Sequence, residues 1–242
     1  MATVAPSAMT MGTVRNITTI MGMNPNRVTA MNTPEAARLQ LAQILSPAFP
    51  IGGFAWSQGL EWAMDQGMVT RRTLPQWLAD WLDHGAGWTD AVLVALALQA
   101  DADHDALDDL ARAACLTSER STETAEQGAA LAANLSALGL AQPPASLPVA
   151  FGRACAAMPL PAPEIIAAFL QAQAAALISA AVRFLPLGPV EGQRMLADLQ
   201  PRILVRALIA SDASEDDLAS ASWGAEITAM RHETMTTRIF RS

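Results

Sequence analysis

Apolar residues recur at helical spacing along most of the chain. From Leu74 onward they fall at positions i, i+3, i+4, i+7 and i+8, which is typical of a helix with one buried face. The next stretch, AVLVALALQA, is apolar on all sides but too short to cross a bilayer, so it predicts a buried helix. Further helical patterns cover about residues 105–116, 118–139, 145–158, 163–183, 188–210 and 215–235.

The residues at two expected helix ends agree with this reading. Thr33, Pro34 and Glu35 predict a helix start, because Thr can cap the first turn, Pro fits the first helical position and an acid favours that end. A shorter helix is expected over residues 57–66, with Gly67 as its stop. The linkers are short and no repeat of about 20–50 residues is visible. We therefore predict a single-domain, all-α bundle of about eight to ten helices.

The first 33 residues lack this periodicity. They hold six of the twelve Met and two charged residues, Arg15 and Arg27. No basic start leads into a sustained apolar run, so the segment does not resemble a secretory signal. We expect a flexible, Met-rich extension over residues 1–33 and the helical domain, including a C-terminal docking tail, over residues 34–242.

Composition narrows the range of functions. The chain is 52% hydrophobic and 16% charged, so it should fold, and its net charge of −8 argues against nucleic acid as a partner. All fifteen basic residues are Arg. The absence of Lys excludes a Walker A loop, a Schiff base and a Ser-Lys dyad, which all need the Lys amine. Cys115 and Cys155 are far apart, which predicts neither a zinc module nor a disulfide framework and favours a reducing compartment.

The stretch AWSQG at residues 55–59 is one residue away from the G-x-S-x-G nucleophile elbow of α/β-hydrolases. The order Ser57, then Asp198 or Asp212, then His232 also matches that class. A nucleophile elbow requires a buried strand before the Ser, however, and SPAFPIGGF is too rich in Pro and Gly for one. We interpret Ser57 as a helix N-cap, with Gly59 allowing close packing, and keep a serine hydrolase using Ser57 and His232 as the alternative.

Two groups of charged residues and the three His are the remaining candidates for a functional site. The run DADHDALDD lacks the Gly and Glu of an EF-hand loop and predicts the acidic start of a helix. Glu119 and Glu123 form an i, i+4 like-charge pair, for which an Arg elsewhere would compensate. We interpret them as a partner-facing or dimer-facing cluster, with buried catalytic carboxylates as the alternative. A metal site built on His would need ligands from distant segments or a dimer axis, because only three His are present: His84, His104 and His232.

The C-terminal segment MRHETMTTRIFRS has an apolar pair where chain ends usually fray. Ile239 and Phe240, bracketed by Arg238 and Arg241, predict docking onto a partner or back onto the body of the domain. The alternative is a helix end whose Arg side chains clamp its own last carbonyls.

Three separate stretches resemble one family. PAFPIGGFAWSQGLEWAMDQG is similar to a block of Pro-Ile-Gly-Gly, an aromatic residue and Ser-Gln-Gly-Leu-Glu. AAVRFLPLGPVEGQRML is similar to a segment with Arg, an apolar pair, Pro-Leu-Gly and then Gly-Gln-Arg, and RHETMTTRIFRS is similar to an ending His-Glu…Arg-Leu-Phe-Arg-Ser. Their order and spacing agree over about residues 36–242. The chain thus resembles the urease accessory proteins called UreF.

The resemblance implies an all-helical, cytoplasmic protein with no catalysis or cofactor of its own, which acts in assembling the nickel centre of urease. Members dimerise, bind a second accessory protein, UreD (also called UreH), and through that complex recruit the GTPase UreG to apo-urease. Some have been proposed to regulate GTP hydrolysis by UreG. Neither nucleic acid nor a membrane is expected as a partner. A direct nickel carrier that uses the three His is kept as a further alternative.

The resemblance also implies roles for single residues. Phe54 matches an exposed aromatic that contacts the GTPase, and Arg238 matches an Arg linked to that contact and to ordering of the tail. Phe240 and Arg241 complete the terminal motif. An arginine finger would come from Arg231, Arg238 or Arg241, although a rim contact that fixes orientation is the simpler reading. The family glycines, interpreted as turn or close-approach positions, are matched at Gly52, Gly53, Gly59, Gly188 and Gly192.

Overall fold

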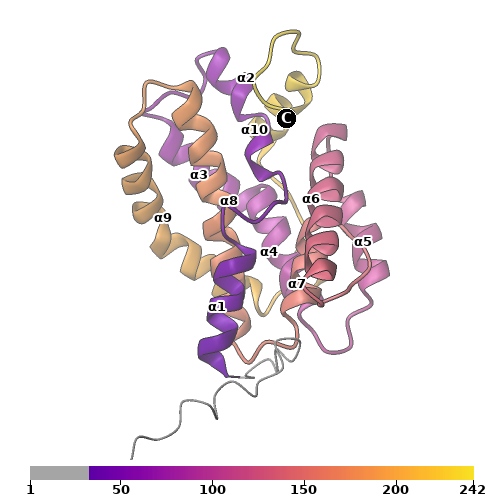
Figure 1. The fold of residues 1–242 in the computed structure, drawn as a ribbon. Helices are drawn as coiled ribbons and strands as arrows, with labels where there is room; N and C mark the ends of the chain where they lie inside the picture. Colours follow the sequence, from indigo (N-terminus) through magenta and orange to yellow (C-terminus); the bar gives the residue numbers. More distant parts are fainter. Residues whose placement is uncertain (1–32) are drawn as a thin grey trace, which may run out of the picture. The chain divides into compact units, whose positions relative to one another are not determined.

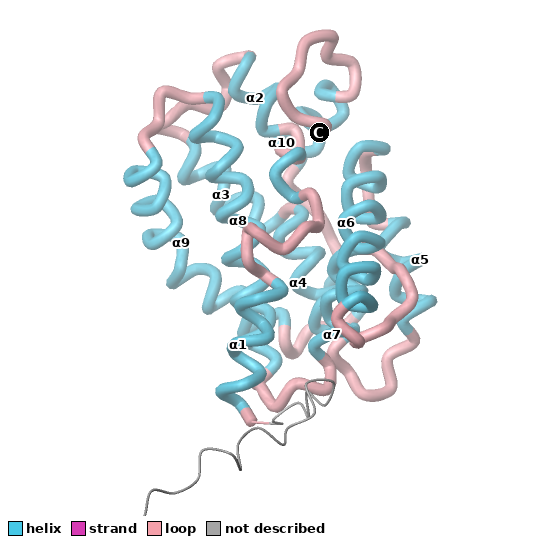
Figure 2. The backbone as a smooth tube through the Cα atoms, in the orientation of Figure 1, coloured by secondary structure: helices cyan, strands magenta, loops and turns pink. Residues whose placement is uncertain are grey.

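The structure is a computed structural model that describes residues 33–242. The predicted extension lies outside these residues except for Thr33. The described residues form helices and loops without strands (Figures 1 and 2), so the prediction of an all-α bundle of about eight to ten helices is confirmed. The α-helices are α1 (Pro34–Ile44), α2 (Leu60–Asp65), α3 (Leu74–His84), α4 (Ala86–Ala97), α5 (His104–Ala113), α6 (Ser118–Ala137), α7 (Leu147–Cys155), α8 (Ala162–Phe184), α9 (Pro189–Ala210) and α10 (Trp223–His232).

The core is centred on α4 and α8. Every residue of α4 from 91 to 97 is buried, and the helix packs against α3, α5, α7, α8 and α9. The predicted buried helix at AVLVALALQA is therefore confirmed. Phe151 of α7 and Phe169 of α8 meet in the core with ring centroids 5.0 Å apart, a geometry that adds about 0.5–1.5 kcal/mol to their burial.

Among the described helices, α8 alone is long and apolar enough to cross a membrane. Its most apolar 18-residue window has a mean hydropathy of 1.9. Yet 56% of that window is buried inside the domain, where α8 packs along α9 and against α4 and α2. A central helix of a soluble protein has the same composition, and the packing here is of that kind.

Side-chain caps begin several helices. The Thr33 hydroxyl accepts a hydrogen bond from the backbone N–H of Ala36 at 3.3 Å, which confirms the predicted start of α1. The Asp103 carboxylate caps α5 in the same way, so the run DADHDALDD is indeed an acidic helix start. Thr117 caps α6 and thereby fixes the end of that helix from which Glu119 and Glu123 project.

Asp108 of α5 ties that helix to the start of α7. Its carboxylate accepts hydrogen bonds from the backbone N–H of Ser146 at 2.5 Å and from Arg112. Burial acts to raise the pKa of Asp108, but these donors outweigh it and the pKa is lowered. The ionised carboxylate is therefore part of the folded structure.

The helix expected over residues 57–66 is shorter than predicted. It is α2, which begins at Leu60, because Gln58 and Gly59 have left-handed backbone with φ of 54° and 78°. An α-helix cannot contain such residues. Gly67, with φ of 69°, follows the end of α2 as predicted.

The single helix expected over residues 215–235 is wrong. The segment contains a short 3₁₀ helix, η3 (Glu215–Asp217), then extended chain, and then α10. The extended chain bonds to other elements instead of to itself, since the Asp217 carbonyl accepts from the Trp88 indole and the Ala221 N–H donates to the His84 carbonyl. These contacts place α10 beside α2.

Candidate functional site

The C-terminal tail, residues 233–242, is docked on the body of its own chain, next to α2 and α10 (Figure 1). It runs beside residues 54–61. The Arg241 N–H donates to the Ala55 carbonyl and the Ser57 N–H to the Ser242 carbonyl, both at 2.7 Å. Of the two docking modes that the sequence predicts, this structure contains the one in which the tail binds back.

Glu61 in the first turn of α2 holds the tail by its backbone. Its Oε1 accepts from the N–H of Ile239 at 2.6 Å, and its Oε2 accepts from the N–H of Phe240 at 2.9 Å. The side chain is 1% exposed. A buried carboxylate is stabilised by such donors, and the two N–H groups would otherwise lack partners.

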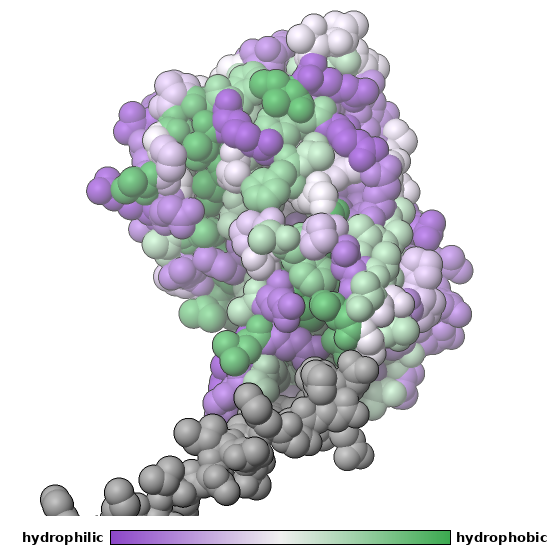
Figure 3. Space-filling view, in the orientation of Figure 1, coloured by the Kyte–Doolittle hydropathy of each residue, from purple (hydrophilic) through white to green (hydrophobic). Residues whose placement is uncertain are grey.

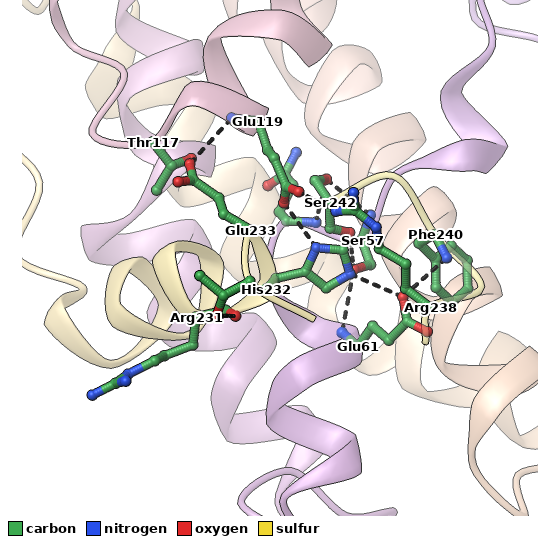
Figure 4. Close-up of polar contacts among 12 residues, drawn as sticks. Ser57, Glu61, Thr117, Glu119, Arg231, His232, Glu233, Arg238, Phe240 and Ser242 are labelled. Atoms are coloured by element: carbon green, nitrogen blue, oxygen red, sulfur yellow. Dashed lines mark hydrogen bonds and ion pairs between the residues drawn. The ribbon is translucent and has the colours of Figure 1, made fainter. Parts of the chain in front are cut away.

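His232, the last residue of α10, links this carboxylate to a second one (Figure 4). Its Nε2 lies 2.9 Å from Glu61 Oε2 and its Nδ1 lies 2.8 Å from Glu119 Oε2, with the imidazole fully buried. The other oxygen of Glu119 accepts from Arg238 of the tail. Three helices and the tail therefore meet at one chain of charged groups.

Residues 57–59 form the turn against which the tail ends. The Ser57 hydroxyl donates to the Ser242 carbonyl and accepts from the Glu61 N–H at 3.2 Å. The N–H of Gln58 donates to the Ser242 hydroxyl at 3.2 Å, while its side chain accepts from the Trp81 indole at 2.8 Å. Ser57 thus serves the start of α2 as predicted, but as a hydrogen-bond acceptor two residues before the true N-cap, Gly59.

Gly59 sets how closely α2 and α10 approach. A Cβ on this residue would lie 2.4 Å from the backbone nitrogen of Ala229 in α10, nearer than non-bonded atoms can come. Its φ of 78° is also left-handed. Both properties require glycine here, and the resulting contact brings His232 over Glu61.

Two Arg side chains join the tail to the body by cation–π contacts, one from each side of the interface. The guanidinium of Arg183 lies 4.3 Å from the ring centre of Phe240 and donates to the Phe54 carbonyl at 2.7 Å. Arg241 lies 4.4 Å from the ring centre of Trp56 and pairs with Glu126. Such cation–π contacts contribute about 0.5–2 kcal/mol each.

A second buried ionic group lies deeper, behind the turn at residues 57–59. Arg120 pairs with Asp90 at 2.5 Å and with Glu123 at 2.9 Å. Burial raises the pKa of Asp90 even though Arg120 opposes the shift. For Arg120, burial acts to lower the pKa, but Asp90 and Glu123 outweigh it and the pKa is raised.

The predicted charged cluster on α6 therefore faces the interior of its own chain. Glu123 is neutralised by Arg120 and accepts from Gln127 at 3.1 Å, while Glu119 pairs with Arg238 and lies 2.8 Å from His232 Nδ1. The Arg expected from elsewhere is Arg238 of the tail, which pairs with Glu119, whereas Glu123 pairs with Arg120 of the same helix. The interpretation of both Glu as partner-facing is wrong, since both are turned inward.

Known proteins are similar to this chain over most of its length. A family model described as UreF matches residues 68–200. The urease accessory protein UreF of Paracoccus denitrificans is 72% identical over 211 residues, which cover 87% of this chain and 98% of that relative. The chain belongs to the UreF family. The UreF proteins of Cereibacter sphaeroides (strain ATCC 17023) and Roseobacter denitrificans are 52% and 43% identical over 86% and 85% of the chain, covering 99% and 94% of those relatives.

The residues that the UreF resemblance singles out lie in different environments. Phe54 is 48% exposed and Ile239 is 65% exposed, whereas Phe240 is buried at 2%. Arg238 and Arg241 are exposed but paired with Glu119 and Glu126. In the docked state Phe240 is thus an anchor of the tail, and a direct partner contact through it requires the tail to move.

Arg231 and the family glycines also lie in different environments. Arg231 is exposed, points away from the buried cluster (Figure 4) and forms no ion pair within residues 33–242. Gly52 is left-handed, with φ of 78°, and a Cβ on Gly192 would lie 3.0 Å from α8 side chains. Gly53 and Gly188 have neither property in the structure, so their conformation does not explain the glycine there.

The hydrolase alternative does not fit the geometry. The Ser57 hydroxyl is buried and bonded to the tail carbonyl of Ser242, and both ring nitrogens of His232 are taken by carboxylates. No strand precedes Ser57 within the described residues. Neither a nucleophile elbow nor a free general base is formed.

The nickel-carrier alternative gains no support from the same residues. His84 ends α3, and His104 bonds the Ala97 carbonyl at 3.0 Å near the start of α5, while His232 lies in the buried cluster. Within residues 33–242, no group of three or more His, Cys, Asp or Glu side chains is arranged to hold a metal ion.

The sequence did not reveal Glu61 as the main acceptor of the tail. It lies within the quoted block SQGLE, in the first turn of a helix, where an acid is ordinarily read as a solvated residue. The only sequence signal for burial of Glu61 was its position between two apolar residues, Leu60 and Trp62, in the short helix α2.

Proposed function

We propose that this chain is a non-enzymatic, cytoplasmic maturation factor that bridges UreD (UreH) and the GTPase UreG and so serves nickel insertion into apo-urease. One observation carries the proposal. Two segments shared with the UreF family, residues 52–61 and the tail, form one composite surface through the Ala55–Arg241 and Glu61–Ile239 hydrogen bonds. Phe54 and Ile239 are exposed on these two segments.

The composition of this surface suits a protein partner. Exposed aromatic and aliphatic side chains beside Arg are the residues that dominate binding energy at interfaces. Phe54 and Ile239 supply the apolar part, while Arg238 and Arg241 supply charge and are already oriented by Glu119 and Glu126. A partner would therefore meet a preorganised surface, which lowers the entropic cost of binding.

Modulation of GTP hydrolysis by UreG is the finer part of the proposal. An arginine finger must leave its own chain and reach a phosphate. Arg231 is the most accessible candidate, because it forms no ion pair among the described residues, whereas Arg238 and Arg241 would first have to leave Glu119 and Glu126. A rim contact that orients the partner remains the role we assign to the latter two.

We also propose that the chain forms a homodimer. An apolar groove of about 900 Å³ runs between α1, the loop at residues 45–54 and the outer side of α8. On the face shown in Figure 3, apolar residues lie among polar ones around α1 and the loop that follows it. The α8 side of the groove is lined by small residues, Ala168, Ala172, Ala175 and Ala176, which allow close approach of another helix.

Co-expression with UreD and UreG, followed by size-exclusion chromatography, tests the bridging role. We expect the wild-type chain to elute in a complex with both, and the double variant Phe54→Ala/Ile239→Ala to lose UreD or UreG. The matched control is Leu138→Ala/Leu140→Ala, whose side chains are 54% and 47% exposed at the far end of α6. The proposal fails if the wild-type chain elutes alone, or if both variants retain both partners equally.

A truncation after Ala229 complements the point variants. It removes His232 and the whole tail, and with them every donor to Glu61 from the C-terminal segment. We expect loss of the partners together with a retained helical circular dichroism spectrum. Retention of UreD and UreG by the truncated chain would assign their binding to another surface.

A further inference from the structure

The imidazole of His232 has a carboxylate oxygen at each ring nitrogen. Glu61 Oε2 lies 2.9 Å from Nε2, and Glu119 Oε2 lies 2.8 Å from Nδ1. Both distances are those of hydrogen bonds, and the ring is fully buried, so water cannot mediate either contact. An ionised carboxylate only accepts, so each ring nitrogen must donate.

A neutral imidazole has a single N–H, and its other nitrogen has a lone pair. The observed geometry therefore needs one proton more than neutral His and two carboxylates contain. We propose that docking of His232 and the tail onto α2 and α6 takes up one proton, so that docking weakens as the pH rises. The proton count is the same whether the proton resides on the ring or on one of the two carboxyl groups.

The charges that face the ring support the same count. Glu61 comes from α2 and Glu119 from α6, and the tail contributes Arg238, which bonds Glu119. With the extra proton, two negative and two positive charges balance in the buried cluster. Without it, one negative charge is uncompensated and a ring lone pair faces a carboxylate oxygen, and each of these costs free energy at a buried site.

Other charged groups nearby are hydrogen-bonded or paired to different partners. The carboxylate of Glu233 accepts from the N–H and hydroxyl of Ser118 at 2.7 and 2.8 Å. Arg120 pairs with Asp90 and Glu123 on the inner side of α6. None of them donates to or accepts from the ring of His232, so the balance rests on Glu61, Glu119 and Arg238.

The expected effect has a defined size. Where the undocked imidazole is neutral, above about pH 7, uptake of one proton makes the docking constant fall about tenfold per pH unit. Towards lower pH, where the undocked imidazole is itself charged, the dependence flattens. A docking reaction without proton uptake would show no slope in either range.

Hydrogen exchange in the isolated full chain measures this slope. The reporters are the backbone N–H groups of Ile239 and Phe240, whose bonds to Glu61 exist only when the tail is docked. Their protection factors, corrected for the intrinsic exchange rate at each pH, should fall about tenfold per pH unit above neutrality. A flat protection profile above neutrality would overturn the proposal.

Variants separate proton uptake from a merely structural role. Glu119→Gln removes one of the two carboxylates and should abolish the slope, because a neutral ring can then donate to Glu61 and accept from the Gln amide. If this variant does not fold, Glu61→Gln supplies the test, because a neutral ring can then donate to Glu119 alone. Glu126→Gln, which alters only the exposed pair with Arg241, should keep the slope. A slope that persists in both Glu119→Gln and Glu61→Gln would contradict the assignment. The test uses this chain alone, so its failure leaves the proposed bridging role standing.

Discussion

Replacing Glu61 by Gln tests the central role of this carboxylate in holding the tail. Three donors reach the two oxygens of Glu61, namely the ring of His232 and the N–H groups of Ile239 and Phe240. A Gln amide has only one accepting oxygen, and its NH₂ group faces a donor in either orientation. At least one buried donor is thus left without an acceptor, and the charge-assisted bond to His232 becomes neutral.

The free-energy cost of Glu61→Gln follows from these lost hydrogen bonds. An unsatisfied buried donor costs about 1–3 kcal/mol, and bonds to a charged group are worth about 1.5–3 kcal/mol. We therefore expect a loss of about 3–5 kcal/mol. Because the affected contacts join the tail to the body and leave the α4–α8 core untouched, the loss should fall on docking of the tail. The population of the detached tail should then rise about a hundredfold to several thousandfold.

Limited proteolysis with trypsin provides the assay, since Arg231, Arg238 and Arg241 are its cleavage sites in this region. Cleavage by dilute protease follows the population of the open form, so the Glu61→Gln tail should be cut faster by the same factor. Glu126→Gln is the matched control, because it weakens an exposed ion pair of the same tail worth at most about 1 kcal/mol. If Glu61→Gln is cleaved no faster than Glu126→Gln, the reasoning about Glu61 is refuted.

Three further predictions concern stability and reactivity. Gly59→Ala should lower the melting temperature far more than Gly67→Ala: both positions are left-handed, but only at Gly59 would the Cβ meet backbone of α10, at 2.4 Å, and equal shifts would contradict this. Burial raises the pKa of Cys155 to about 12, so iodoacetamide at mildly alkaline pH should modify Cys115 first and Cys155 only on unfolding, as mass spectrometry would show. The lowered pKa of Asp108 means that its contribution to stability is present above about pH 4 and lost as the pH falls through the folded-state value. Urea unfolding at neutral and acid pH should therefore show a smaller pH effect in Asp108→Asn than in the wild type, and an unchanged effect would contradict the assignment.

Periodicity and capping chemistry were sufficient to predict most of the helices. The stripe that begins at Leu74 and the apolar run of α4 are buried as expected, and Thr33 and Asp103 are caps. These features depend on residues close in sequence, so local rules determine them. The start of α2 was missed for a different reason. Gln58 is left-handed without being glycine, a conformation that its bonds to Trp81 and the tail stabilise and that no local pattern indicates.

The buried cluster was only half predictable. The like-charge pair on α6 indicated that a cation must come from elsewhere, and Arg238 of the tail is that cation for Glu119, whereas Glu123 pairs with Arg120 of its own helix. The pairing of Glu61 with His232 joins residues 171 positions apart and depends on the close contact between α2 and α10. Sequence spacing cannot specify such a contact. The family resemblance pointed to both segments but not to the bond between them.

Glu61 binds the tail through the main-chain amides of residues 239 and 240, and this affects which amino-acid substitutions the tail tolerates. All residues except proline have a backbone N–H, so these hydrogen bonds do not depend on which other side chain occupies position 239. Ile239 is left pointing outward, free to be exchanged as a partner's surface changes, while attachment stays constant. The main chain of this short peptide therefore attaches the tail, while the side chain at position 239 is available for recognition. A substitution at this position can change recognition without weakening attachment.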